Sequence, residues 1–364
     1  MTRPLWIVAG GTGGHIFPAL SLADRLDRHK HSLMMITDRR GQPLISAHRS
    51  CTVLPAASPF AGSPLRRLGA MLTLLAGAVS CCVLMLKHRP TAIIGFGGYP
   101  AFVPLALGRL FRIPVGLHEQ NAVMGKANRM LASLSECTMT SWPHTKGLPD
   151  NVTPIHTGLP VRAGFTDLSD YRPVPDGPLH IVISGGSLGA RLFGEVIPQA
   201  ICSLAEDIRA RLSIIHQVRD EQRETVEAFY NKHGISAQIS SFFSDMPALM
   251  ATADILICRA GASSVAEVSA AGRAAILVPF AAAADNHQHA NAEVLASAGG
   301  AIIIPEPEMT AERLSGELDS LARSDEKRTA LAHSARTLHT QNAADAMYQA
   351  IHSTLRPLSV QEMS

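Results

Sequence analysis

The range 255–291 contains the polar groups whose types and spacing are best suited to chemistry. It reads as an apolar run, a Gly/Ser turn ending at Glu267, an Ala-rich helix, a second apolar run and a polar loop that contains Gln288. In a parallel α/β sheet, ligands bind at the carboxyl ends of strands, and a Gly/Ser turn at a helix N-terminus presents free backbone N–H groups. Such a turn suits a diphosphate. It contains Ala262, Ser263, Ser264, Val265 and Ala266.

Glu267 and Gln288 could bind the sugars attached to that diphosphate. Glu267 lies one helical turn after Ser263, so its carboxylate can reach the same site and accept hydrogen bonds from ribose hydroxyls. The amide of Gln288 could hold a sugar hydroxyl without adding charge beside a phosphate. A local role fits the same residues, because Ser263 and Ser264 with Glu267 resemble a capping box. Both interpretations stay open for this stretch taken alone.

His15 closes the first glycine turn, Gly10-Gly11-Thr12-Gly13-Gly14-His15, and is its one titratable residue. Imidazole exchanges protons near neutral pH, so a histidine here could act as a general base on a hydroxyl. The alternative is a histidine that caps or spaces the loop. The turn misses the dinucleotide pattern, because Ile16 occupies the third glycine position. Asp38 could still bind a ribose, but we predict no nicotinamide cofactor.

Four consecutive polar residues, from His118 to Asn121, follow a further short strand pattern. They include the carboxylate of Glu119. Polar residues at a strand's carboxyl end are expected to face a ligand, although ordinary loop polarity remains the alternative for any one of them. Arg162, at the end of Thr157-Gly158-Leu159-Pro160-Val161-Arg162, could neutralise a phosphate at a domain border.

Strand-like runs alternate with helical ones along the whole chain, which predicts an α/β protein with parallel sheets. The expected strands are Leu5 to Ala9, Ser32 to Thr37, Ala92 to Gly95, Val115 to Leu117, Leu179 to Ser184, Leu212 to Gln217, Ile255 to Cys258 and Ala275 to Pro279.

The length of 364 residues indicates two domains. We expect an N-terminal domain over 1–167, a Pro-rich linker over 168–178 and a C-terminal domain over 179–340. A helix over about 341–357 is a candidate to pack back on the first domain. The second domain opens, like the first, with a strand and a glycine turn, Gly185 to Ala190. Two similar halves form a cleft between them, which is the expected site.

The charge is divided unevenly although the net charge is only +2. Residues up to Asp150 include 16 Lys and Arg against 6 Asp and Glu, which is +10, and the remaining 16 against 24 give −8. A basic half indicates an anionic partner, such as phosphate or a membrane surface. We predict no nucleic-acid partner, because aromatic residues are only 5% and no recognised binding motif occurs.

The six cysteines show no C-x-x-C spacing, and most lie in apolar runs. They are expected to be reduced core residues in a cytoplasmic protein, so no metal site is predicted. The apolar run Leu5 to Ala9 is too short for a signal peptide, and no export is expected.

The range 68–86 has no charged residue and is flanked by Arg66 and Arg67 and by Lys87-His88-Arg89. Its length is sufficient for a membrane span. However, it lies where an α/β repeat needs a crossover helix, so we favour a helix with a basic-edged apolar face that lies on a bilayer surface. The residues expected on that face are Arg66, Arg67, Leu72, Leu75, Val79, Leu86 and, from the second glycine turn, Tyr99.

Taken together, these motifs resemble the MurG-type glycosyltransferases of peptidoglycan assembly. The resemblance covers nearly the whole chain, with seven motifs in the family's order. They are Gly10 to His15, Gly95 to Tyr99, His118 to Asn121, Thr157 to Arg162, Gly185 to Ala190, Arg259 to Glu267 and Asp285 to Asn291.

The resemblance implies a GT-B fold of two Rossmann-like domains and an inverting, metal-independent transfer without a cofactor. N-acetylglucosamine would pass from UDP-N-acetylglucosamine to the undecaprenyl-diphosphate-linked MurNAc-pentapeptide, lipid I, giving lipid II with a β-1,4 linkage. The enzyme would be peripheral on the cytoplasmic face of the inner membrane, and other cell-wall synthesis proteins are candidate partners.

The resemblance also implies roles for individual residues. Ser187 and the turn from Ala262 to Glu267 would contact the diphosphate and ribose, and the backbone of Phe243 would frame the uracil. Gln288 and Asn121 would contact the sugar, and Arg162 would lie near the nucleotide. Thr12, Gly13 and Gly14 would face the cleft, with His15 as the expected base and Glu119 as its competitor.

Leu188 departs from the family pattern, because the family usually has Gln there. Two other functions share some of these features. A UDP-N-acetylglucosamine 2-epimerase has the same architecture and ligand but no use for an apolar, basic membrane face. A catalytically inactive scaffold on the membrane surface would have no physical reason to retain His15, Glu267 and Gln288.

Overall fold

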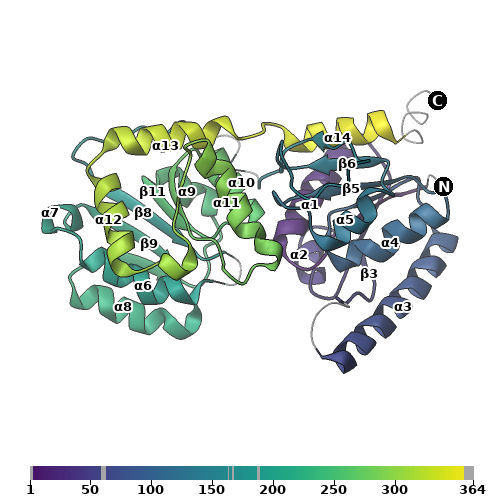
Figure 1. Cartoon of the computed structure of the whole chain (residues 1–364), viewed down its shortest axis with the longest axis horizontal. Coiled ribbons are helices and arrows are strands. Elements are labelled where there is room, and N and C mark those ends of the chain that lie inside the picture. Colours follow the sequence, from purple (N-terminus) through teal and green to yellow (C-terminus); the bar gives the residue numbers. More distant parts are fainter. Residues whose placement is uncertain (1–2, 59–62, 163, 166–167, 187–188, 356–364) are drawn as a thin grey trace. The chain divides into compact units, whose positions relative to one another are not determined.

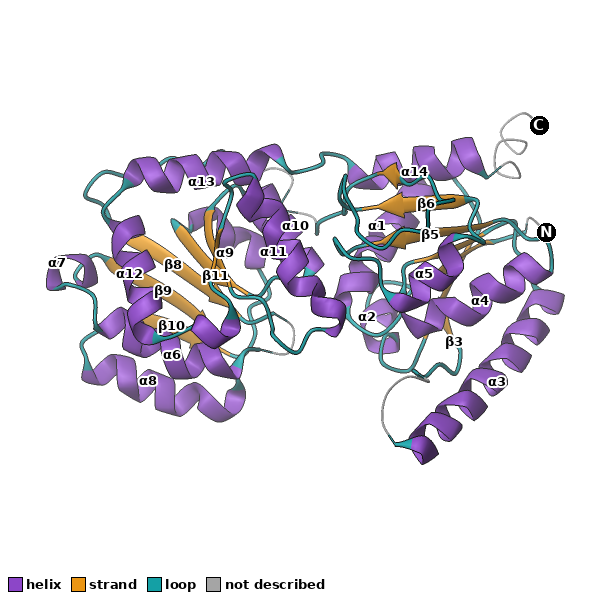
Figure 2. Cartoon of the chain, viewed as in Figure 1, coloured by secondary structure: helices purple, strands orange, loops and turns teal. Residues whose placement is uncertain are grey.

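The computed structural model describes residues 3–58, 63–162, 164–165, 168–186 and 189–355. Contacts divide the chain into two units, one of residues up to Pro160 with those from Thr340 onward, and one of Val161–His339. Each unit is a parallel sheet covered by helices, as expected for this α/β class (Figures 1 and 2). The described part of 161–167, which we expected in the first domain, groups with the second unit.

The first unit has a sheet in the order β3-β2-β1-β4-β5-β6-β7, with all neighbours parallel. The interior strand β1 is buried at every position, as an apolar run covered on both faces should be. The strands are β1 (Leu5–Val8), β2 (Leu33–Thr37), β3 (Cys51–Val53), β4 (Ile93–Gly95), β5 (Val115–Glu119), β6 (Cys137–Thr140) and β7 (Ile155–His156). The helices are α1 (Gly13–Arg28), α2 (Gln42–Ser46), α3 (Pro64–Lys87), α4 (Gly98–Leu110), α5 (Lys126–Ala132) and α14 (Ala343–Thr354).

The second unit has a parallel sheet in the order β10-β9-β8-β11-β12-β13. Its strands are β8 (Leu179–Ser184), β9 (Leu212–Gln217), β10 (Ala237–Ser240), β11 (Ile255–Cys258), β12 (Ala274–Leu277) and β13 (Ile302–Ile303). Its α-helices are α6 (Arg191–Cys202), α7 (Glu206–Arg209), α8 (Arg223–Lys232), α9 (Met246–Thr252), α10 (Ala262–Ala271), α11 (His287–Ser297), α12 (Ala311–Ala322) and α13 (Asp325–Thr337). Short 3-10 turns occupy Asp220–Gln222, Ala284–Asn286 and Glu306–Glu308.

In each sheet, the direction in which the chain adds successive strands reverses at one point. In the first unit the chain runs outward from β1 to β2 and β3, and then returns to the other side of β1 with β4. In the second unit the same change occurs between β8 and β11. In open α/β sheets, the loops on either side of such a point diverge to opposite faces, and the space between them is a common ligand site.

The C-terminal helix α14 lies against α1 within the first unit (Figure 1). Met347 and Ile351 are fully buried in the core beside β1 and α1. The ring of Tyr348 stacks on that of His29, with centroids 4.1 Å apart. Helix α14, near the end of the chain, therefore completes the hydrophobic core of the first unit.

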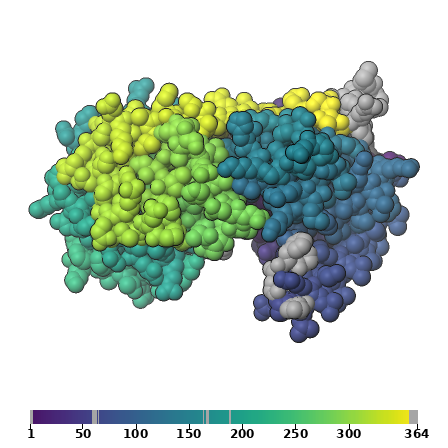
Figure 3. All heavy atoms as spheres, viewed as in Figure 1, coloured from purple at the N-terminus to yellow at the C-terminus, as the bar shows by residue number. Residues whose placement is uncertain are grey.

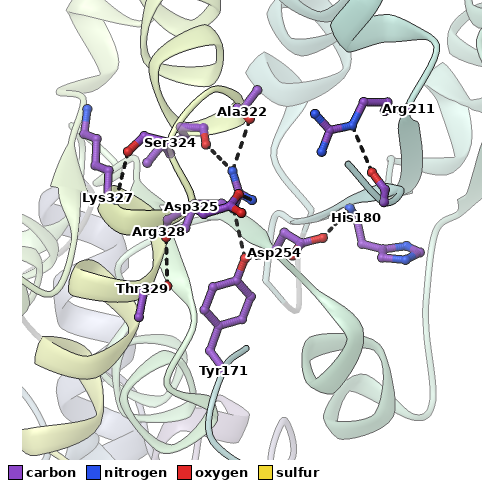
Figure 4. A network of polar contacts seen from close by, with 12 residues as sticks. Tyr171, His180, Arg211, Asp254, Ala322, Ser324, Asp325, Lys327, Arg328 and Thr329 are labelled. Carbon is purple, nitrogen blue, oxygen red and sulfur yellow. Dashed lines mark hydrogen bonds and ion pairs between the residues drawn. The ribbon is translucent and has the colours of Figure 1, made fainter. Parts of the chain in front are cut away.

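The expected linker is tied to the second unit by hydrogen bonds (Figure 4). The hydroxyl of Tyr171 donates to Asp254 over 2.8 Å and accepts from Nε of Arg328 over 2.9 Å. The other carboxylate oxygen of Asp254 accepts from the backbone N–H of His180. Burial raises the pKa of Tyr171 to about 12, so the hydroxyl keeps its proton and remains a donor.

Helix α3, at the lower right of the space-filling view (Figure 3), has a long exposed apolar face. Leu72, Leu75 and Val79 are 60–62% exposed and Leu86 is 81% exposed. The opposite face packs through Cys81 and Met85, which are buried with α4. Among the helices of the described residues, α3 alone is long and apolar enough to cross a membrane, by length and composition.

Candidate active site

The first glycine turn follows β1 and leads into α1. Asp38, which is buried at the end of β2, accepts from the backbone N–H groups of Gly11 and Gly41 over 3.1 and 2.9 Å. The Asp38 carboxylate therefore stabilises the glycine turn. This structural role accounts for Asp38 better than the ribose contact considered for it from the sequence. Helix α1 begins at Gly13 with Thr12 as its N-cap, and Thr12 makes no side-chain capping bond. The first-turn N–H groups of such a helix lack intrahelical acceptors and suit an anion.

His15 lies half-buried in the first turn of α1, beside the glycine turn that follows β4. A methyl group built on Gly97 would lie 3.3 Å from Cε1 of His15. Gly97 also has φ +85° and ψ −177°, a conformation that is essentially restricted to glycine. This turn thus brings backbone against the imidazole in a way that no other residue type would allow. Nδ1 of His15 lies 2.9 Å from Oε1 of Gln120.

Glu119 is buried at the end of β5 and both its carboxylate oxygens are engaged. Oε1 accepts from the backbone N–H and the side-chain amide of Asn121, over 2.9 and 3.1 Å. Oε2 accepts from the backbone N–H of Gly125 over 3.0 Å and from the amide of Asn128 over 2.8 Å. A carboxylate with four donors is poorly placed to take a proton from a substrate. The geometry makes Glu119 the support of the loop that carries Asn121, and does not favour it as a competing base.

The other members of the N-terminal set lie at the same edge of the sheet. Thr12 is exposed, whereas Gly13, Gly14, Tyr99 and Asn121 are half-buried. Tyr99, which we expected on the membrane face with the residues of α3, is the half-buried second residue of α4, directly after the glycine turn. The motifs that contain Thr12 and Asn121 are more than 100 positions apart in the sequence. The structure places both motifs at the same edge of the sheet.

In the second unit, α10 begins at Ala262 after β11, with Gly261 as its N-cap. No side-chain capping bond is present, so the capping-box interpretation of Ser263, Ser264 and Glu267 is wrong. The serines occupy the second and third helical positions instead, where both are half-buried. Oγ of Ser263 has no hydrogen-bond partner among the described residues. The turn therefore retains a hydroxyl and helix N–H groups that an anion could satisfy.

Glu267 pairs with Arg162, whose Nε donates to Oε1 over 2.8 Å. The glutamate side chain is 14% exposed and the arginine 32%. Burial raises the pKa of Glu267, while the charge and hydrogen bond of Arg162 act in the opposite direction. That Arg162 neutralises a phosphate stays a prediction. Its Nε keeps the Glu267 carboxylate oriented, as an ion pair with a fixed hydrogen bond does.

A small cavity of about 20 Å³ lies beside Glu267 and has room for about one water molecule. It is lined by Val182, Ser184, Met246, Met250, Leu256, Cys258, Ser264 and Glu267. Burial, together with the charge of Glu267, raises the pKa of Cys258 to about 12. This thiol therefore stays protonated and acts as a core residue, and the polar part of the lining comes from the two serines and the carboxylate.

Gln288 is the second residue of α11, and Phe243 is half-buried in the loop before α9. Oε1 of Gln288 accepts from the backbone N–H of Phe280 over 2.9 Å, which leaves its NH2 group as the part of the amide that can donate to a sugar hydroxyl. Ser187 and Leu188 lie outside the described residues.

Gln217 is a residue that the sequence motifs missed. Its Nε2 donates to the carbonyl oxygens of Gly186 and Ser241, and its Oε1 accepts from the hydroxyl of Ser184. One amide thus joins the loops after β8 and β10. Its position at the carboxyl end of β9 was the one signal that could have identified it. Within the described residues, no group of three or more His, Cys, Asp or Glu side chains could hold a metal ion.

Two family models match this chain and together cover most of it. The N-terminal domain of glycosyltransferase family 28 matches residues 5–140, and the C-terminal domain of that family matches residues 180–349. The chain belongs to glycosyltransferase family 28. The expected fold of two parallel-sheet α/β domains, the GT-B fold, is thereby confirmed.

Individual members of glycosyltransferase family 28 refine this assignment. A relative from Rhodospirillum centenum is named UDP-N-acetylglucosamine–N-acetylmuramyl-(pentapeptide) pyrophosphoryl-undecaprenol N-acetylglucosamine transferase. It is 43% identical over 324 residues, which cover 87% of this chain and 86% of the relative. The solved structure of Acinetobacter baumannii MurG matches with a TM-score of 0.80 and 30% identity over 96% of this chain and 99% of that one. The MurG-type resemblance is confirmed.

A more distant structure bears on the competing function. A protein from Listeria monocytogenes, described as a UDP-N-acetylglucosamine 2-epimerase, matches with a TM-score of 0.70 but only 12% identity, over 98% of each chain. This likeness shows a shared fold alone. The sequence relationship therefore favours the transferase over the epimerase.

Glu119→Gln tests whether this carboxylate supports the loop. The variant replaces one acceptor oxygen with an NH2 group that must face existing donors, so we expect the free energy of unfolding to fall by about 1.5–3 kcal/mol. Glu136→Gln is the control, because this half-exposed carboxylate makes an ion pair with Arg109, and surface pairs contribute about 0–1 kcal/mol. Urea unfolding measures both. Unchanged stability of Glu119→Gln, with transfer abolished, would restore Glu119 as a candidate base.

Proposed function

We propose that this chain transfers N-acetylglucosamine from UDP-N-acetylglucosamine to the C4 hydroxyl of the muramoyl sugar in undecaprenyl-diphosphate-linked MurNAc-pentapeptide, with inversion. It is a UDP-N-acetylglucosamine-dependent hexosyltransferase of peptidoglycan synthesis that converts lipid I to lipid II. The observation that carries this function is the near-full-length match to a transferase of that name. The residues that perform each step are proposals from the geometry of each unit.

The acceptor side of the reaction belongs to the N-terminal unit. His15 is the proposed general base, which takes the proton from the C4 hydroxyl as that oxygen attacks the anomeric carbon. The start of α1, at Thr12, Gly13 and Gly14, is proposed to hold the acceptor's diphosphate through backbone N–H groups. Asn121, held by Glu119, is proposed to contact the donor sugar.

The donor side belongs to the C-terminal unit. The N-terminus of α10 is proposed to hold the diphosphate and to stabilise the charge that develops on the leaving UDP. Because helix N–H groups can supply this stabilisation, the proposed mechanism uses no metal ion. Glu267, oriented by Arg162, is proposed to accept from the ribose hydroxyls, and Gln288 to donate to the sugar. The backbone near Phe243 is proposed to frame the uracil, and Ser187 to contact the diphosphate.

Helix α3 supports a peripheral attachment to the cytoplasmic face of the membrane. Its apolar side chains are exposed over several turns, and Arg66 and Arg67 at its beginning are exposed as well. An apolar face with basic residues at its edge binds an anionic bilayer surface by burial and by charge. The enzyme would thereby meet an acceptor whose lipid stays in the bilayer.

The test of this function is transfer of radiolabelled N-acetylglucosamine from UDP to a short-chain lipid I analogue by the purified protein, with and without a chelator. We expect labelled lipid II at equal rates in both. No product, with donor binding intact, would contradict the function. Interconversion of the donor's hexosamine without acceptor would then indicate an epimerase.

The proposed base is tested by His15→Ala. Loss of a general base should reduce kcat by about two to four orders of magnitude and leave the affinity for UDP nearly unchanged. The matched control is His48→Ala, which removes an exposed histidine of the same unit and should leave both quantities unchanged. Near-normal turnover of His15→Ala would eliminate this role.

The proposed donor contact is tested by Glu267→Ala. The loss of charged hydrogen bonds to ribose should weaken UDP-N-acetylglucosamine binding by about 1–3 kcal/mol, measured by calorimetry. Glu312→Ala, at an exposed glutamate on α12, is the control. Donor affinity that is equal in Glu267→Ala and the control would refute the assignment.

A further inference from the structure

Behind His15, a line of buried polar groups runs through the N-terminal unit. Oε1 of Gln120 lies 2.9 Å from Nδ1 of His15, and Nε2 of Gln120 lies 3.1 Å from Nδ1 of His118. Nε2 of His118 lies in turn 3.1 Å from the carbonyl oxygen of Gly158. Gln120 and His118 are 1% and 0% exposed, so the protein alone determines these contacts.

The contact with Gly158 determines which ring nitrogen of His118 carries the hydrogen. A carbonyl oxygen can only accept, so Nε2 of His118 carries the hydrogen that it shares with Gly158. Burial, with smaller effects from His15 and His156, lowers the pKa of His118 to about 4, although the bond to Gly158 acts in the opposite direction. The ring is therefore neutral near pH 7, and its Nδ1 has a lone pair and accepts.

That lone pair fixes the orientation of the Gln120 amide. Its NH2 group lies near two acceptors, Nδ1 of His118 at 3.1 Å and the backbone oxygen of His118 at 3.2 Å. A flipped amide would place its own oxygen against both acceptors and lose both bonds. The indole N–H of Trp142 donates to the backbone oxygen of Gln120 over 3.1 Å and helps to hold the residue in place. Oε1 of Gln120 must therefore face His15.

We infer that Gln120 is a positioning residue that holds His15 in the tautomer with hydrogen on Nδ1, which leaves Nε2 as the atom that accepts the substrate's proton. This inference rests on the proposed role of His15 and deepens it by naming the reacting nitrogen. Nδ1 of His15 faces an oxygen that cannot donate, so in the neutral ring Nδ1 carries the hydrogen.

An amide differs from the carboxylate that orients histidine in many hydrolases. A buried carboxylate stabilises the imidazolium form by its charge. Gln120 sets the same tautomer without adding a negative charge to a site that is proposed to bind an anionic acceptor. The orientation comes from a relay of fixed donors and acceptors that ends at a backbone carbonyl.

Nitrogen-15 NMR of the histidine-labelled protein near pH 7 tests the tautomer directly. The His15 signals are assigned by comparison with His15→Ala. We expect hydrogen on Nδ1 in the unaltered protein, and loss of this preference in Gln120→Met, which keeps the side-chain length but removes the oxygen. A His15 ring with hydrogen on Nε2 in the unaltered protein would overturn the inference. This measurement needs no transfer activity. A contrary result would therefore overturn the tautomer inference without contradicting the proposed function.

Kinetics of a double-mutant cycle test whether Gln120 acts through His15. Gln120→Met should lower kcat by about 10–100-fold, the range found when the partner that orients a metal-ligating histidine is removed, and should leave KM for UDP-N-acetylglucosamine unchanged. In the His15→Ala background the same substitution should change kcat by less than about twofold, because the residue that it positions is gone. Equal losses in both backgrounds would show a structural role and overturn the inference. If Gln120→Met does not fold, the nitrogen-15 spectrum of the unaltered protein still tests the tautomer of His15.

Discussion

The carboxyl ends of neighbouring parallel strands are the constraint on which both candidate sites depend. At the carboxyl ends of β1 and β4, and again at those of β8 and β11, the chain leaves the sheet in a tight turn and enters a helix. At Gly97 and Gly186 these turns use φ values of +85° and +76°, which side chains rarely tolerate. The glycines thus bring backbone N–H groups to the sheet edge, and the side chains proposed to act in transfer are arranged around them.

Strand alternation explains why adjacent residues at the end of β5 have different roles. Successive side chains of a strand point to opposite faces of the sheet. His118 and Gln120 share one face and form the hydrogen-bonded line to His15. Glu119 faces the other way, toward Asn128 on α5, and supports the loop that carries Asn121. One strand end therefore orients the proposed base through one face and the proposed sugar contact through the other.

Much of the fold could be predicted from the sequence, because hydrophobic alternation and glycine turns are local signals. The strand at Leu5–Val8 and the turn after Cys258 are examples. The roles of Asp38 and Glu119 could not be predicted, because a carboxylate's role depends on which donors reach it. Those of Asp38 include Gly11, 27 positions away, and the line to His15 joins positions 105 apart. The serines of α10 looked like caps because a capping box and a helix N-terminal anion site use the same residue types; only the start of the helix at Ala262 distinguishes them.

Chemical rescue of His15→Ala by imidazole tests most directly whether His15 takes the acceptor's proton. If it does, free imidazole should restore part of the transfer rate of His15→Ala, with more basic substituted imidazoles of similar size restoring more. The rates of Glu267→Ala and of the unaltered enzyme should not respond. A transfer rate of His15→Ala that no imidazole changes, or an equal response in all three proteins, would contradict the assignment of His15 as the base.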